Sequence, residues 1–346
     1  MHRRLGAVTI AAALVMTTAP PVQGQGQGQG GSATGSAAYT PPRTPWGDPD
    51  LQGIWPGTHM VGVPFERPDQ FGTRLWLTDE EFKARQAAAE RQANLDVLDF
   101  DLANPPPEIV ALGDVGDGTS PPPHWLERGE PSRQASLIVD PLDGKAPPMT
   151  AEGKARQQLV KTTYIQRTGF TRPDELGPYD RCISRGVVGS MMPVVYNNGN
   201  QIVQAPSFVA FRNEMIHEVR IIPLDGREPL PGSMSSWMGS SRGRWEGNTL
   251  VVRTTGLNGK TGMQGNGMML LPSEALVLEE RFTPVGPDAL QYEVTIEDPE
   301  TWTAPFTVSF PLKRDPEYRM FEYACHEGNH AMRNVLSGSR ADEAAN

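Results

Sequence analysis

The sequence predicts a mainly β protein, an antiparallel up-and-down barrel preceded by an irregular, proline-rich N-terminal arm with one or two short helices. Residues 289–297 alternate apolar and polar side chains, which is the period of a half-buried strand. Beyond Arg181, other short runs of this kind are separated by turn residues. Before it, the proline-rich chain shows little periodicity.

The first 24 residues are typical of a secretory signal peptide. Arg3 and Arg4 precede an uncharged, mostly apolar run over residues 5–16, which is too short to span a bilayer. Residues 25–40 follow as a Gly-, Gln- and Ser-rich linker, whose composition predicts a flexible tether. We therefore expect a periplasmic or secreted protein.

A single domain is expected over residues 41–340, in which 41–180 form the arm. Thr78 and Glu81 are spaced as a capping box, so a helix is predicted over residues 82–94. Thr150 is a suitable N-cap for a second helix over residues 151–161. Proline blocks at 105–107 and 121–123 argue against regular elements between them.

A meander of about eight strands is expected over residues 181–340. Residues 243–245 and 249–254 flank the turn residues 246–248, which predicts a hairpin. Strands are also expected at 201–211, 215–223, 306–312 and 318–325. Closure into a barrel would leave no exposed edges. Gly53-Ile54-Trp55 is similar to the Gly-x-Trp entry of lipocalin-like barrels, which favours that type of barrel.

Charge and missing motifs exclude several classes of function. The formal net charge is −10, and loss of Arg3 and Arg4 makes it more negative, so nucleic acid is not expected as a partner. No later apolar stretch is long enough for membrane insertion. The sequence has no P-loop and no dinucleotide fingerprint after a predicted strand, which argues against phosphoryl transfer and nicotinamide chemistry. A small-molecule ligand remains, with no oligomeric state predicted.

The chain has two cysteines, Cys182 and Cys325. Export to an oxidising compartment favours a disulfide between them, with two separate buried thiols as the alternative. A metal site is less favoured because neither cysteine belongs to a C-x-x-C unit.

Residues 326–330 match H-E-x-x-H, which places two zinc-binding imidazoles, His326 and His330, one helical turn apart. The context is poor, because the motif follows a predicted strand and Gly328 disfavours a helix. No cofactor is expected, and zinc is the alternative. In a second interpretation, His326 and Glu327 act as general acid and base, with Arg181 as electrostatic partner. In a third, they only bond backbone groups at the end of a strand.

Five further residues are candidates for ligand binding. Arg185 suits an anionic or hydroxylated ligand, and Tyr196, Trp237 and Trp245 suit rings, whereas His217 is expected in a strand. Each also has an ordinary structural role as an alternative. Methionines in the glycine-rich loops are expected to line the mouth of the pocket: Met191, Met192, Met234, Met238, Met263, Met268 and Met269.

Four tracts together resemble an uncharacterised family of exported bacterial proteins. They are residues 45–55, 181–186, 245–252 and 323–329, and they extend over nearly the whole mature chain. The resemblance implies no reaction and supplies no catalytic role. Members usually have an aromatic residue at the position of His330, which weakens the zinc interpretation.

Three hypotheses of function follow. The first is an exported hydrolase or lyase that uses His326, Glu327 and Arg181 in general acid–base catalysis on a small carbohydrate or aromatic compound. The second is a non-catalytic, lipocalin-like binding protein, and the third is a zinc-dependent hydrolase.

Overall fold

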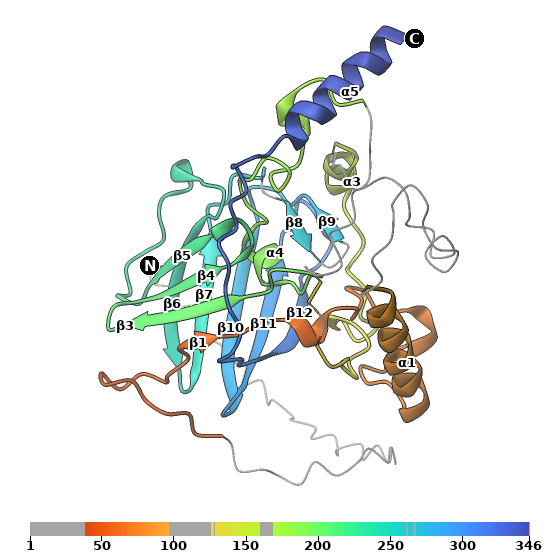
Figure 1. Cartoon of the computed structure of the whole chain (residues 1–346). Coiled ribbons are helices and arrows are strands. Elements are labelled where there is room, and N and C mark those ends of the chain that lie inside the picture. The colour runs from red at the N-terminus through yellow and green to blue at the C-terminus, as the bar shows by residue number, and fades with distance from the viewer. Residues whose placement is uncertain are drawn as a thin grey trace, which may run out of the picture. The chain divides into compact units, whose positions relative to one another are not determined.

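A computed structural model describes residues 39–96, 126, 127, 129–159, 169–260, 262–265 and 268–345 of the chain (Figure 1). The predicted signal peptide and nearly all of the predicted linker lie outside the described residues, as do the two proline blocks of the arm. Residues Ala38–Asn346 form one compact unit.

The elements of this unit are mainly strands. In chain order they are β1 (Gly53–Ile54), α1 (Asp79–Asp96), β2 (Ile138–Asp140), α3 (Ala151–Gln158), α4 (Val187–Met191), β3 (Asn200–Ala205), β4 (Phe208–Asn213), the 3₁₀ helix η5 (Met215–His217), β5 (Val219–Pro223), β6 (Ser240–Glu246), β7 (Thr249–Thr255), β8 (Met263–Gly265), β9 (Met268–Leu270), β10 (Val277–Gly286), β11 (Ala289–Glu297), β12 (Phe306–Lys313) and α5 (Ala331–Ala345). Short 3₁₀ helices also occur at Thr58–Met60, Asp69–Phe71, Pro173–Glu175 and Gly232–Met234.

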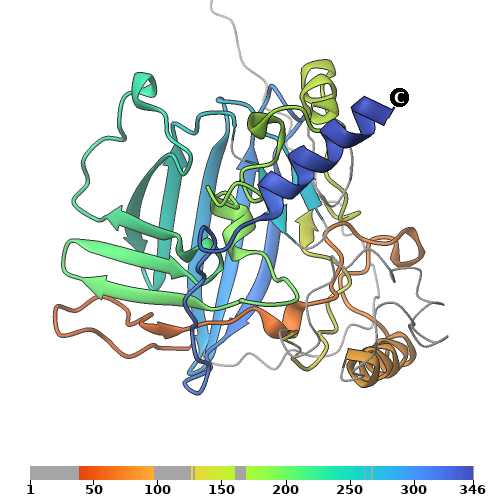
Figure 2. The same ribbon diagram turned by 45° about the horizontal axis from the view of Figure 1, so that its top comes forward.

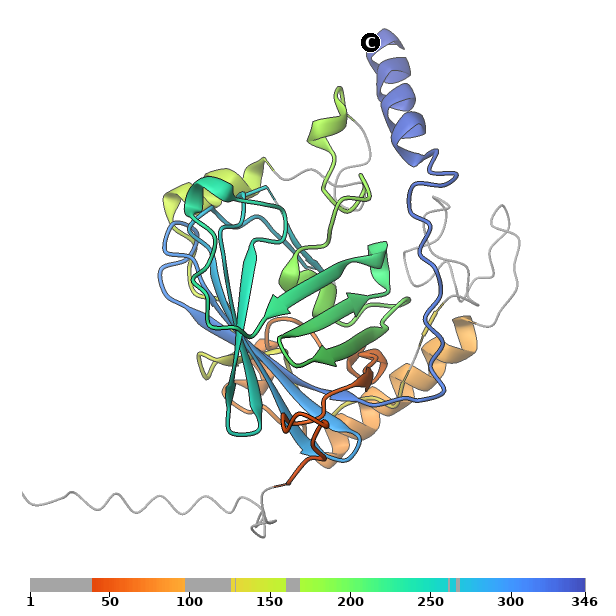
Figure 3. The ribbon, with the colours of Figure 1, turned by 90° about the vertical axis from the view of Figure 1, so that its left-hand side faces the viewer.

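Two antiparallel sheets form the body of the unit (Figure 3). The first has the order β1-β3-β4-β5, and the second has the order β2-β12-β11-β10-β7-β6. Strands β5 and β6, at the ends of the two sheets, lie close together. Among the described residues, however, no ladder joins the sheets. The antiparallel β architecture is confirmed, whereas the closed lipocalin-like barrel is not.

The aromatic core runs from one sheet into the other. Phe211 of β4 packs against Phe282 of β10 with ring centroids 4.6 Å apart. Phe282 contacts Tyr292 at 5.0 Å, and Tyr292 contacts Phe310 at 5.3 Å. These side chains are inward-facing members of alternating strands, so the period-2 pattern places them all between the sheets.

A buried ion pair lies beside this aromatic row. The guanidinium of Arg220 (β5) donates two hydrogen bonds to the carboxylate of Glu280 (β10), and one of them measures 2.9 Å. The Tyr292 hydroxyl donates to the same carboxylate at 3.2 Å. Burial, together with the Glu280 charge, raises the pKa of Tyr292 well above its ordinary value, so the phenol stays protonated. The pair therefore links the two sheets through their interior.

The two predicted helices are present. Thr78 and Glu81 form the capping box, since the Glu81 carboxylate accepts from the Thr78 N–H at 2.8 Å and Thr78 Oγ1 accepts from the Glu81 N–H at 3.3 Å. Thr150 caps α3 by accepting from the Gly153 N–H at 2.9 Å. Helix α3 ends at Gln158, slightly before the expected end at residue 161.

Three predicted strands need correction. The strand expected at 201–211 is a hairpin, because Pro206 and Ser207 turn the chain between β3 and β4. The strand expected at 215–223 begins only at Val219, after η5. Residues 318–325 form no strand at all. They are held by side-chain hydrogen bonds and by a disulfide, as described below, so their alternating pattern was misleading.

None of the helices within the described ranges combines the length and the apolar character that a membrane crossing requires.

Candidate functional site

Residues 314–330, here called the strap, run from the end of β12 to α5 (Figures 1 and 3). Near its start, the Asp315 N–H donates to the Ile54 carbonyl of β1 at 3.1 Å. The Arg314 guanidinium lies 4.6 Å from the centre of the Trp55 ring, close to Gly53. The strap thus passes along the four-stranded sheet without joining it as a strand.

Two carboxylates hold the middle of the strap. The Tyr318 hydroxyl lies 2.8 Å from Glu127 Oε1 and 2.7 Å from Glu214 Oε2. Glu214 is buried and also accepts from the Phe321 N–H at 2.7 Å. Burial and the two carboxylates raise the pKa of Tyr318 above its ordinary range. Since a phenol has one hydrogen, it can donate to only one carboxylate at a time.

Backbone and amide groups of the segment before β3 complete the environment of these carboxylates. Glu127 accepts from the backbone N–H groups of Asn197 and Asn198, at 2.8 and 3.1 Å. Glu214 accepts from the Asn197 side-chain amide at 3.1 Å and from the Gly199 N–H at 3.2 Å. The carboxylates thus join the strap to residues 197–199.

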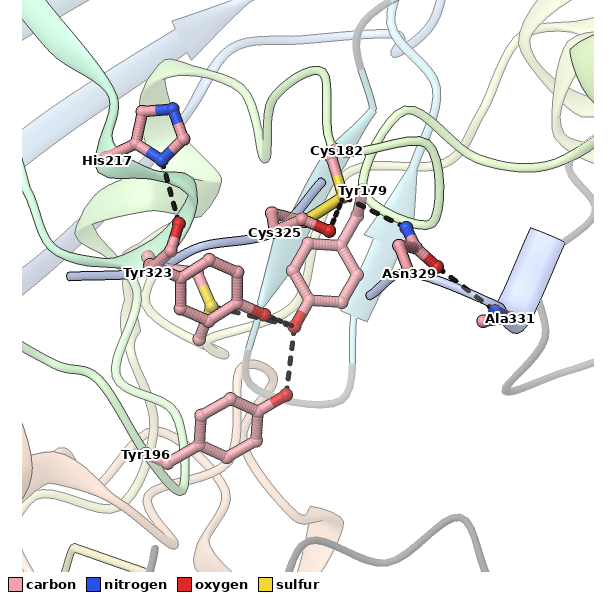
Figure 4. Close-up of a disulfide and its surroundings, with 9 residues drawn as sticks. Tyr179, Cys182, Tyr196, His217, Tyr323, Cys325, Asn329 and Ala331 are labelled. Carbon is pink, nitrogen blue, oxygen red and sulfur yellow. Dashed lines mark hydrogen bonds between the residues drawn. A yellow bond between two sulfur atoms is a disulfide. The ribbon is translucent and has the colours of Figure 1, made fainter. Parts of the chain in front are cut away.

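A disulfide anchors the end of the strap. Cys182 and Cys325 are bonded, with Cα atoms 5.7 Å apart, so the predicted pairing is present. The Asn329 amide donates to Cys182 Sγ at 3.2 Å and its carbonyl oxygen accepts from the Ala331 N–H at 3.2 Å (Figure 4). Residues 326–330 then lead from Cys325 to α5, the dark blue C-terminal helix in Figure 2.

Helix α5 is packed against the segment that precedes Cys182. Leu336, Met332 and Val335 of α5 contact Phe170 and Leu176 in a small apolar cluster. The Phe170 N–H also donates to the hydroxyl of Ser339 at 3.1 Å. The strap and α5 thus face residues 169–182, and the disulfide lies between them.

A cavity of about 1040 Å³ lies between these segments, and we call it the strap cavity. Its volume is at the upper end of the range for small-molecule sites. Its lining is partly aromatic, partly aliphatic and partly acidic: Leu126, Glu127, Leu176, Tyr179, Asp180, Cys182, Tyr196, Asn197, Phe321, Glu322, Tyr323, Ala324, Cys325, Glu327, Gly328, Asn329, Ala331, Met332 and Val335.

Three phenols converge in the wall of the strap cavity. The Tyr179 hydroxyl lies 2.9 Å from that of Tyr196 and 3.2 Å from that of Tyr323 (Figure 4). Burial raises the pKa of Tyr323, and the neighbouring Tyr196 acts in the same direction. Tyr323 is therefore a neutral phenol near pH 7, able to donate as well as to accept a hydrogen bond.

A second, smaller cavity of about 500 Å³ also lies against residues 322–327 of the strap. It is lined by Arg212, His217, Glu322, Tyr323, Ala324, Cys325, His326 and Glu327. His217 lies in η5, not in the predicted strand, and its Nδ1 is 2.8 Å from the Tyr323 carbonyl. A carbonyl can only accept, so Nδ1 carries the hydrogen and Nε2 of the neutral ring has a free lone pair.

The backbone at this histidine is unusual. Ile216 and His217 have φ values of 59° and 46°, in the left-handed region that non-glycine residues rarely occupy. For the β-branched Ile216 this conformation is costly, and such costs concentrate at functional sites. No sequence pattern predicts this conformation.

The predicted catalytic residues do not form one cluster. His326 and Glu327 are both exposed on the strap, where His326 lines the smaller cavity and Glu327 lines both. Within the described part of the chain, neither side chain makes a hydrogen bond. Arg181 lines neither cavity. Its guanidinium lies 5.8 Å from the centre of the Trp237 ring. The three residues therefore do not line one cavity in the described structure.

The structure distributes the predicted ligand-binding residues over several places. Tyr196 lies in the wall of the strap cavity and His217 in that of the smaller one. Arg185 is buried behind the Tyr179 ring, 5.8 Å from its centre. Trp237 and Trp245 line neither cavity, and Trp245 packs against the core. Of the loop methionines whose side chains the structure describes, Met191, Met192 and Met263 belong to the core, and Met234 and Met238 line neither cavity.

The H-E-x-x-H tract precedes α5, which begins at Ala331, so the helix that a zincin motif requires does not include it. Across the described ranges, no three His, Cys, Asp or Glu side chains are grouped closely enough to share a metal ion.

Tyr179, Tyr323 and Glu127 are site residues that sequence reasoning missed. The tyrosines stand close to Cys182 and Cys325, so the predicted disulfide could have led to two of them. Glu127 gave no such signal. Comparison with protein-family models, with curated proteins and with solved structures gives no match for this chain.

Proposed function

We propose that this chain is an exported, non-catalytic protein that binds a small molecule in the strap cavity. The observation that carries the proposal is the convergence of three tyrosine hydroxyls in the wall of a cavity of about 1040 Å³. Apolar walls with a few convergent polar groups are typical of ligand sites.

The lining suits a molecule with a ring or an apolar body. Leu176, Met332 and Val335 supply aliphatic surface, while Phe321 is 66% exposed although it lies at the cavity. When a ligand covers an aromatic side chain as exposed as this one, the burial of its apolar surface favours binding. The phenols would then fix the orientation of the ligand through hydrogen bonds.

A ligand screen tests the proposal. The purified mature protein would be screened by thermal shift against sugars, aromatic acids, phenols and amines, and hits would be measured by calorimetry. We expect Ala331→Trp, which adds a large side chain at the cavity wall, to weaken a hit at least tenfold. Tyr39→Phe, at a tyrosine outside the cavity, is the control and should bind normally. A hit unaffected by Ala331→Trp would contradict the proposal.

A second candidate function is general acid–base catalysis, as a hydrolase or lyase, in the smaller cavity. The hydrogen bond from His217 Nδ1 to the Tyr323 carbonyl favours it, because a fixed tautomer leaves Nε2 available as a base. His326 has no such orienting partner within the described residues. Turnover of any screened compound that is lost in His217→Gln and retained in His326→Gln would support this candidate over the binding protein.

A further inference from the structure

The negative charge of the strap cavity indicates which class of ligand it binds. This inference rests on the proposed binding function. We infer that the ligand is an organic cation, an amine or quaternary ammonium compound attached to a ring or an apolar chain. The cavity itself is the site, and its lining defines the chemistry of the ligand.

Four acidic side chains line the strap cavity: Glu127, Asp180, Glu322 and Glu327. In the described part of the chain, no Lys, Arg or His side chain is among its lining residues. Glu322 and Glu327 are exposed strap residues without an ion pair in that same part of the structure. Both also line the smaller cavity, but neither forms an ion pair there within the described residues, and their negative charges favour a cation in the strap cavity.

The aromatic lining points to the same class independently of the acids. Tyr179, Tyr196, Tyr323 and Phe321 all contribute to the wall. Neutral aromatic rings attract cations through their negative faces, and several rings around one cavity are a recognised way to hold a quaternary ammonium group. Since burial raises the pKa of Tyr323, that ring is present as the phenol.

The positive groups nearby lie outside this lining. Arg185 is buried behind the Tyr179 ring, and Arg181 lies at the Trp237 ring. Arg212, His217 and His326 line the smaller cavity and not the strap cavity. The smaller cavity shares Glu322 and Glu327 with the strap cavity and adds basic side chains, whereas the lining of the strap cavity is acidic and aromatic. An anionic ligand therefore fits the strap cavity poorly.

Three probes of similar shape and different charge test the inference. Binding of benzyltrimethylammonium would be compared by calorimetry with that of its uncharged isostere neopentylbenzene and of anionic phenylacetate. We expect the cation to bind about tenfold more tightly than the isostere, an advantage that falls at high salt. Equal affinity for the cation and the isostere, or tighter binding of phenylacetate, would overturn the inference.

Variants that remove one negative charge test whether the acids of the cavity lining are responsible for cation binding. We expect Glu322→Gln and Glu327→Gln each to weaken cation binding about threefold and to leave binding of neopentylbenzene unchanged. Glu317→Gln, at an exposed acid of the strap outside the cavity lining, is the matched control and should bind as the wild type does. A loss of cation affinity as large in Glu317→Gln would mean that the overall charge of the chain, and not the cavity, attracts the cation.

The experiment separates this inference from the binding proposal. If uncharged or anionic compounds bind and Ala331→Trp weakens them, the cavity is a ligand site and only the charge assignment is wrong. If no probe or screened compound is sensitive to Ala331→Trp, the binding proposal fails and the inference fails with it.

Discussion

Cys182 and Cys325 are separated by 143 residues in the sequence, and their disulfide lies in the wall of the strap cavity. This bond is the covalent link between the two sides of the cavity, which otherwise meet through the α5 cluster and the Tyr179–Tyr323 contact. The integrity of the candidate site should therefore depend on it.

Replacing both cysteines by alanine should loosen the strap. Closing a loop this long restricts the unfolded chain, so we expect the free energy of unfolding to fall by roughly 3–5 kcal/mol. Urea denaturation measures the loss, and hydrogen exchange should show faster exchange in α5 than in β10–β12. Unchanged exchange in α5 would mean that its apolar contacts suffice to hold it.

Gly199 should not tolerate a side chain. A Cβ there would lie 2.7 Å from Glu214 Oε2 and 2.7 Å from Tyr318 Cε1, so one of these groups would have to move. We expect Gly199→Ala to lower the free energy of unfolding by about 1–3 kcal/mol. Gly338→Ala is the control, because a Cβ at this position in α5 meets nothing within 4 Å and alanine favours a helix. Equal stability of the two variants would contradict the description of the strap.

Stability should fall between pH 6.5 and pH 4 because of His59. Burial, and to a smaller extent the charge of Lys313, lowers the pKa of His59 from 6.5 to about 4. The unfolded chain therefore binds a proton in this range that the folded chain does not, and protonation favours unfolding. The contribution is fully present above pH 6.5 and decreases as the pH falls towards 4, by up to about 3 kcal/mol.

Urea denaturation of His59→Gln across this range checks the prediction. The variant should lose part of the pH dependence of the wild type. Parallel pH profiles for His59→Gln and the wild type would show that His59 is not responsible.

Removing one partner of the buried ion pair should be more harmful than removing both. Glu280→Gln leaves the buried guanidinium of Arg220 without a counter-charge, and we expect a loss of about 3–5 kcal/mol. In the double variant Arg220→Met, Glu280→Leu, no charge is left unpaired, so we expect a loss of less than about 2 kcal/mol. A double variant as unstable as Glu280→Gln would mean that the pair itself stabilises the two sheets.

Local sequence patterns predicted most helices and strands, whereas the strap cavity depends on contacts between residues that are distant in the sequence. The capping box at Thr78 and Glu81 and the alternation of β11 involve neighbours in the sequence, so both could be recognised there. Residues 318–325 also alternate, yet Tyr318 is held by Glu127 and Glu214, which are distant in the sequence. No sequence period records such contacts. The predicted cysteine pair was the one long-range relationship that pointed towards the cavity.

The disulfide also has a topological consequence. Strands β3 to β12 lie between Cys182 and Cys325, so the bond encloses ten of the twelve strands found in the described residues in one covalent ring. A protease that cuts once within this ring opens it without releasing a fragment. Such a nicked chain would migrate near full length on a non-reducing gel and separate into two pieces only after a thiol is added. Damage to a surface turn of either sheet would therefore leave both walls of the cavity attached to each other.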